Sequence, residues 1–192
     1  MNNNTRKIVT TAILTALVII LQIFGASIKF GPFSVSLVLV PIVIGAATSG
    51  VASGAFLGFV FGLMVLLTGD ATAFLAINWW GTIATVLLKG TLAGFLSGVT
   101  FEALKNKNKT FAVVAAAAVC PIVNTGVFLL GCFLFFFETI KQWGTAAGFE
   151  GDTVRYMIFG LVGINFVFEF LVDMVLSPVV VRLLDIYKKI RA

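Results

Sequence analysis

The chain has 192 residues, of which 60% are hydrophobic and only 11% are charged, and its mean hydropathy is +1.12. A soluble domain carries roughly a quarter of its residues as charged ones, so this chain lacks the side chains that would cover a globule in water. The composition predicts an integral membrane protein and excludes a disordered chain. Nucleic-acid binding is disfavoured, because the net charge of +5 is not gathered into one basic face. With no histidine and two cysteines, a zinc enzyme is also disfavoured, and histidine-dependent catalytic triads are excluded.

The first apolar segment spans residues 8–24 and follows Arg6 and Lys7. It lacks a clear small-residue cleavage site, so we interpret it as a membrane helix rather than a signal peptide. The next apolar stretch, 33–67, would form a helix about 50 Å long, which exceeds the ~30 Å hydrocarbon core of a bilayer. It must therefore fold back, and the glycine-rich residues 45–54 are the expected place.

Three further apolar segments complete an all-α membrane protein, a compact bundle of six transmembrane helices in one domain over residues 1–192. A loop, 68–80, precedes the fourth helix, and the longest polar stretch, 138–155, separates the fifth from the sixth. The expected helices cover residues 8–24, 35–47, 51–67, 81–101, 111–137 and 156–184.

The basic residues orient this bundle. If both termini lie inside, the inner segments hold nine Lys and Arg residues and the outer segments hold three, with the thirteenth inside a span. Short cytoplasmic loops carry an excess of positive charge in membrane proteins. The distribution therefore predicts that the N- and C-termini are cytoplasmic.

Small residues recur at helical spacing on three helices. In lipid, helices meet where small side chains let their backbones approach, so we expect the glycines of the third and fourth helices to serve packing inside the bundle. The shorter pair on the first helix, Ala12 and Ala16, could equally face a partner protein. The glycines are Gly50, Gly54, Gly58 and Gly62 on the third helix and Gly90, Gly94 and Gly98 on the fourth.

Polar side chains lie inside three of the predicted spans. Lys89 is in the fourth helix and Asn124 is in the fifth, whereas Asn165 and Glu169 are one turn apart in the sixth. Their positions give similar depths, about 12–20 Å below the outer surface, which favours a small-molecule pocket open to the outside. Two interpretations remain open: Lys89 and Glu169 contact a ligand, or they form an ion pair that locks the bundle. Asp173 lies deeper, and could serve the inner leaflet or a partner.

Asn78, Trp79 and Trp80 are expected at the outer mouth of this pocket. Tryptophan commonly anchors helices at the membrane interface. The pair is therefore interpreted either as such an anchor or as an aromatic rim over the ligand.

Three stretches carry a resemblance to a known family. They are TTAILTALVIIL (10–21), FGPFSVSLVLVPIVIGAATSGVASGAFLGFVFG (30–62) and INWWGTIATVLLKGTLAGFLSG (77–98). With these stretches, the chain resembles the substrate-binding S components of energy-coupling-factor (ECF) vitamin transporters over essentially its whole length. The resemblance implies a multi-pass protein of a bacterial cell membrane that binds a vitamin, uses no cofactor and is not an enzyme.

The resemblance also implies partners and site residues. Such proteins dock on a membrane coupling protein that carries two cytosolic ATPases, and they are thought to topple in the membrane to deliver the ligand. By the resemblance, Ala12 and Ala16 would contact the coupling protein. The outer loops and the last three helices would hold the ligand, in the region of Lys89, Asn124, Asn165 and Glu169.

Pantothenate ranks first among the ligands. Lys89 suits a carboxylate, and the amides and Glu169 suit hydroxyl or amide groups. The stretch that holds the two tryptophans and the fourth helix also resembles the pantothenate-type members of the family most. Riboflavin, folate, another vitamin or a nucleobase-like precursor remain open. The alternative function is a stand-alone proton- or ion-coupled transporter or channel, with Lys89, Glu169 and Asp173 as its relay. Transporters of that kind often contain inverted repeats, and the sequence shows none. A membrane scaffold or small membrane enzyme is the third class.

Overall fold

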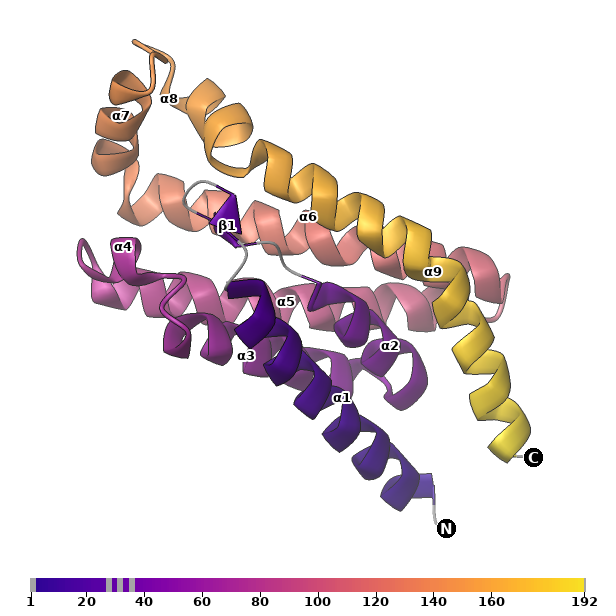
Figure 1. Ribbon diagram of the computed structural model, residues 1–192. Helices are drawn as coiled ribbons and strands as arrows, with labels where there is room; N and C mark the ends of the chain where they lie inside the picture. Colours follow the sequence, from indigo (N-terminus) through magenta and orange to yellow (C-terminus); the bar gives the residue numbers. More distant parts are fainter. Residues whose placement is uncertain (1–2, 27–28, 31–32, 35–36, 192) are drawn as a thin grey trace.

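The computed structural model describes residues 3–26, 29–30, 33–34 and 37–191, and these are almost wholly helical (Figure 1). A two-residue antiparallel pair of strands lies between the first two helices. The elements are α1 (Asn3–Ala26), β1 (Lys29–Phe30), β2 (Phe33–Ser34), α2 (Leu39–Ser49), α3 (Val51–Leu67), α4 (Thr72–Leu75), α5 (Trp79–Leu104), α6 (Lys109–Phe135), α7 (Phe137–Ala146), α8 (Thr153–Arg155), the π-helix η1 (Tyr156–Val162) and α9 (Gly163–Arg191).

The chain folds back between α2 and α3 at Gly50. Its φ of +103° lies in a backbone region that residues other than glycine rarely adopt. The turn therefore lies inside the glycine-rich stretch 45–54 where the sequence predicts it. The start of the expected second helix, at 35–36, falls outside the described residues.

Helices α3 and α5 pack backbone against backbone. A Cβ atom on Gly54 would lie 2.6 Å from the carbonyl oxygen of Gly94, and one on Gly58 would overlap the Gly90 carbonyl. A Cβ atom on Gly62 would likewise lie 2.6 Å from the Val86 carbonyl oxygen. The prediction that these glycines serve internal packing is confirmed for Gly54, Gly58 and Gly62 on α3 and for Gly90, Gly94 and Gly98 on α5. It is wrong for Gly50, which forms the turn and has no atom within 4 Å of an added Cβ.

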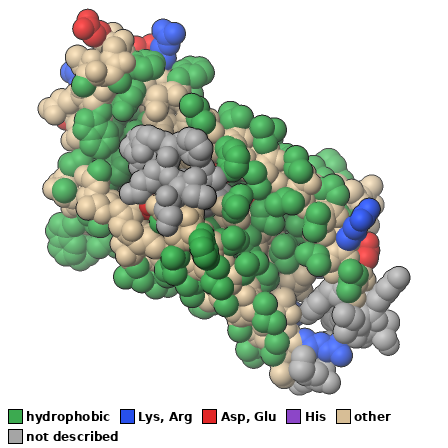
Figure 2. Space-filling model, in the orientation of Figure 1, with side chains coloured by type: hydrophobic (Ala, Val, Ile, Leu, Met, Phe, Trp, Pro, Cys, Tyr) green, Lys and Arg blue, Asp and Glu red, His purple; other side chains and the backbone are tan. Residues whose placement is uncertain are grey.

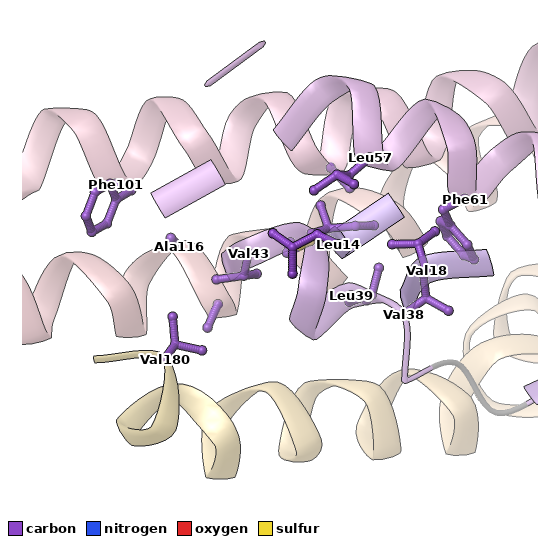
Figure 3. Packing of buried hydrophobic residues seen from close by; sticks show 14 of the residues in the cluster. Leu14, Val18, Val38, Leu39, Val43, Leu57, Phe61, Phe101, Ala116 and Val180 are labelled. Atoms are coloured by element: carbon purple, nitrogen blue, oxygen red, sulfur yellow. The ribbon is translucent and has the colours of Figure 1, made fainter. Parts of the chain in front are cut away.

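The core lies where the inner faces of α1, α2 and α3 meet α5, α6 and α9 (Figure 3). Leu14 and Val18 lie one turn apart on α1 and are buried, as are Leu57 and Phe61 on α3. This spacing of four residues is the stripe expected of a helix that buries one face.

On the face shown in Figure 2, apolar side chains cover the middle of the molecule, and Lys and Arg side chains lie toward its two ends. Four helices are long and apolar enough to cross a bilayer, within Asn4–Ala26, Trp79–Leu104, Lys109–Phe135 and Thr153–Ile186. Helix α2 has only 11 residues and α3 has 17. Eleven residues span about 16 Å, well short of the bilayer core. The count of six spans is therefore confirmed for four helices and stays a prediction for α2 and α3.

The first turns of α1 and the last turns of α9 lie at one end of the bundle, and α4, α7 and α8 lie at the other (Figure 1). An ion pair between Lys109 and Asp185 joins the start of α6 to the end of α9.

The polar stretch 138–155, expected to connect the fifth and sixth helices as a loop, is helical over its first half, which belongs to α7. Ile140 and Gly144 are buried there, and the Trp143 ring meets the Phe74 ring edge-on at 5.6 Å. These positions are three and four residues apart and share one helix face. Polar residues lie between these positions and lower the mean hydropathy of the segment, so a hydropathy profile does not predict this short amphipathic helix. The helix before it ends at Phe135 rather than 137, because Phe136 leaves the helical conformation with a φ of −132°.

Candidate functional site

A pocket lies among α1, α3, α5, α6 and α9, close to the short helix α4. The centres of water molecules could occupy about 80 Å³ of it. Its apolar wall is formed by Phe61, Val65, Ala71, Phe74, Val86, Phe128, Phe136, Val162 and Phe166. Its polar lining is formed by Gln22, Asp70, Thr82, Thr85, Lys89, Asn124, Thr125, Asn165 and Glu169. The structure thus brings together the four polar residues expected from their depth in the membrane. An aromatic wall with a few convergent polar groups is typical of a small-molecule site.

Lys89 projects between two aromatic rings. Its Nζ lies 5.4 Å from the centroid of the Phe61 ring and 5.4 Å from that of the Phe128 ring, a distance at which cation–π attraction operates. Within the described ranges of the chain, no carboxylate oxygen lies within 4.0 Å of Nζ. The structure therefore shows no direct Lys89–Glu169 ion pair. The ammonium group is left with hydrogen-bonding capacity that a ligand can use.

Glu169 and Asn165 form one polar unit on α9. Asn165 Nδ2 donates a hydrogen bond to Glu169 Oε1 at 3.2 Å, and the two residues are one helical turn apart. Glu169 is only 3% exposed, yet it lines the pocket. The bond holds the carboxylate on the pocket side of the helix.

Asn124 faces the same cavity from α6. It is 5% exposed, and its Oδ1 has no hydrogen-bond partner among the residues that the structure describes. A buried carbonyl oxygen is nearly always hydrogen-bonded in a folded protein. This acceptor is therefore available to a bound molecule.

Gln22 and Asp70 belong to the lining but are absent from the sequence prediction. Gln22 Nε2 donates a hydrogen bond to Asp70 Oδ2 at 2.6 Å and ties α1 to the turn after α3. Spacing alone could have identified the glutamine, because it follows Leu14 and Val18 at intervals of four on the buried face of α1. Asp70 stands in the segment expected as a loop, where periodicity gives no signal.

Asn78, Trp79 and Trp80 do not line the pocket. Asn78 caps α5: its Oδ1 accepts from the Gly81 backbone N–H at 3.0 Å. The two indole rings stack on each other with centroids 4.1 Å apart, and they are 54% and 66% exposed. This exposure agrees better with an interfacial anchor than with a rim, and contact with a ligand stays a prediction.

Ala12 and Ala16 lie on the exposed face of α1, opposite its buried stripe. Ala12 also lines a shallow groove with Ala52, Ser53 and Phe56 of α3. Asp173 is 3% exposed, lies one turn beyond Glu169 and is not part of the pocket lining. Among the described residues, no group of three or more Cys, Asp and Glu side chains is close enough to hold a metal ion.

Comparisons with known proteins identify the family of the chain. Residues 6–184 match the family model described as ECF transporter, substrate-specific component. The chain is 27% identical over 187 residues to a curated protein of Lactococcus lactis subsp. cremoris (strain MG1363) named pantothenic acid transporter PanT, with 88% of this chain and 89% of that protein covered. No solved structure matches significantly. The chain therefore belongs to the substrate-specific components of ECF transporters, which are multi-pass membrane proteins that bind a transported substrate and are not enzymes.

Proposed function

We propose that the chain captures pantothenate in the pocket around Lys89 and delivers it to an ECF module for ATP-driven import. The observation that carries this proposal is the ammonium group of Lys89, which lies among aromatic rings in a pocket inside the bundle and is not ion-paired with any described carboxylate. A cation within a membrane domain is costly and is typical of a functional site. The name of the Lactococcus relative supports the same ligand.

The rest of the pocket suits the other parts of pantothenate. Its carboxylate would pair with Lys89, whereas Asn124, Asn165 and Glu169 offer partners for its amide and hydroxyl groups. Its branched hydrocarbon portion would pack against rings such as Phe74 and Phe136. Asn78, Trp79 and Trp80 would stand at the outer entrance.

We further propose that both termini are cytoplasmic, as the basic residues indicate, so that the end with α4, α7 and α8 faces outward. The exposed Ala12 and Ala16 would contact the membrane coupling protein that carries two ATPases. Small side chains on that face permit close helix contact and sliding, which suits a subunit that topples during transport.

The test is calorimetric titration of the purified protein with pantothenate and with pantothenol, in which a hydroxymethyl group replaces the carboxylate. We expect pantothenate to bind more tightly than pantothenol. Lys89→Met should weaken pantothenate binding by about 10- to 100-fold, because a charge-assisted hydrogen bond is lost, and should remove the preference over pantothenol.

Lys105→Met is the matched control, because Lys105 pairs with Glu102 at the exposed end of α5. It should bind like the wild type. Wild-type protein that binds another vitamin and not pantothenate would overturn the substrate assignment. A Lys89→Met variant with unchanged affinity would overturn the role given to the lysine.

One observation favours the alternative of an ion-coupled stand-alone transporter. Asp173 is buried, and its Oδ2 has no hydrogen-bond partner among the described residues. An intramembrane acid in this state can carry a proton. Uptake that needs no ATPase module and collapses with the proton gradient would support this function over the first.

A further inference from the structure

Thr85 is a pocket residue whose hydroxyl has no hydrogen-bond partner. It is 5% exposed, and its Oγ1 is bonded to nothing in the part of the chain that the structure describes. A helical threonine usually donates its hydroxyl to the carbonyl four residues earlier. On the same helix Thr82 does so to Asn78 at 2.7 Å, and Thr91 does so to Leu87 at 2.7 Å. Thr85 departs from this pattern at the pocket wall.

Packing against α6 holds the Thr85 side chain in place. A Cβ atom on Gly131 would overlap both Oγ1 and Cγ2 of the threonine, so the side chain occupies the space that the glycine leaves open. A β-branched side chain has few rotamers, and close packing restricts it further. The hydroxyl is therefore held in position without a hydrogen bond of its own.

A second unsatisfied atom, Oδ1 of Asn124, lines the same cavity from the neighbouring helix. A site built to bind a hydroxyl leaves buried polar groups unpaired when that hydroxyl is missing, and so it rejects analogues without one. Lys89, one turn after Thr85 on α5, supplies the complementary donor. The pocket thus has a cationic position beside a hydroxyl-binding position.

We infer that Thr85 and Asn124 bind a hydroxyl group of the ligand while Lys89 binds its carboxylate, which makes the ligand a hydroxy acid with the two groups several bonds apart. This assignment rests on the proposed function and extends it to Thr85. No hydrogen bond joins the Thr85 hydroxyl to the Lys89 ammonium group, whose Nζ lies between the Phe61 and Phe128 rings. The two positions are therefore separate, which suits the carboxylate of pantothenate and the hydroxyl beside its amide carbonyl.

The experiment combines protein variants with a ligand analogue. Pantothenate and its analogue lacking both hydroxyl groups are titrated against the wild type, Thr85→Val and Thr91→Val. Valine keeps the shape of threonine and removes the hydroxyl. Thr85→Val should weaken pantothenate binding by about 3- to 15-fold and leave the affinity for the analogue unchanged. Thr91→Val, whose hydroxyl is satisfied by the backbone, should bind both ligands like the wild type.

Thr85→Ser restores the hydroxyl and should recover most of the affinity, and thermal unfolding without ligand verifies that each variant is folded. If Thr85→Val weakens the binding of both ligands equally, or leaves both affinities unchanged, the role given to Thr85 is overturned. The proposed substrate would not be affected by that result. A wild type that does not bind pantothenate would overturn the proposed substrate, and the assignment with it.

Discussion

At the scale of single residues, substitution of Glu169 distinguishes a role in ligand binding from a role in stability. Gln in its place keeps the shape and can still accept the hydrogen bond from Asn165. Because no described cation lies within ion-pair distance of Glu169, Glu169→Gln should leave the melting temperature without ligand nearly unchanged. Pantothenate affinity should fall by about tenfold, because an amide accepts hydrogen bonds more weakly than a carboxylate.

Calorimetry and thermal unfolding of the same preparation measure both quantities. Glu102→Gln is the control, since Glu102 lies at the exposed end of α5 and should affect neither. A lower melting temperature with unchanged affinity would assign Glu169 to stability instead.

Sequence reasoning predicts polar pocket residues where a charge or amide interrupts an apolar span, as Lys89 and Asn124 do. Thr85 gives no such signal, because threonine is common in membrane helices and usually bonds its own backbone. Only the structure shows that the Thr85 hydroxyl has no hydrogen-bond partner among the described residues and that the side chain packs against Gly131 of α6. Residues of this kind depend on tertiary contacts and cannot be predicted from spacing.

At the scale of elements, the contact between α3 and α5 depends on the absence of side chains. A methyl group on Gly58 would overlap the Gly90 carbonyl, and neither backbone can move without separating the helices. Gly58→Ala should therefore destabilise the protein by about 1–3 kcal/mol, the usual range for overpacking. Thermal unfolding in detergent measures the change.

Gly126→Ala is the matched control for Gly58→Ala. Gly126 is also helical, but a Cβ atom there would have no other atom within 4 Å. This substitution should leave stability unchanged or raise it slightly, because alanine favours a helix over glycine. Equal losses in the two variants would show that the helix contact does not depend on the glycine.

Hydropathy predicts the long helices well because a bilayer imposes one length and one composition on them. It fails for α7, since Phe137–Ala146 is amphipathic and lies at the end of the bundle. It also gives no sign that the last long helix begins with the π-helical turn Tyr156–Val162. The π-helix has the same apolar composition as the helix it begins, so hydropathy cannot distinguish the two.

At the scale of the whole molecule, an apolar flank between charged ends suits a protein that lies in a bilayer (Figure 2). Its pocket reaches Phe74 of the short helix α4. The chain itself carries no motif for nucleotide hydrolysis. Membership in the ECF family implies that the energy comes from a separate module. Transport therefore requires a surface that recognises that module without disturbing the pocket.

Ala12 and Ala16 are the residues proposed for that surface, and Ala16→Trp tests them. The alanine is exposed on the face of α1 that points away from the core, so a larger side chain can be accommodated without repacking. Pantothenate binding in detergent should therefore remain at the wild-type level. Uptake by cells that contain an ECF module should fall by at least about tenfold, because the indole prevents close approach of the partner.

Val175→Trp is the control for this experiment, because Val175 is 72% exposed on α9, on a different helix. It introduces the same indole into the lipid-facing surface and should leave uptake unchanged. Loss of both binding and uptake in Ala16→Trp would show that α1 supports the pocket rather than the docking surface. Normal uptake in Ala16→Trp would mean that the module docks elsewhere, and the apolar face of α9 would then be the next surface to test.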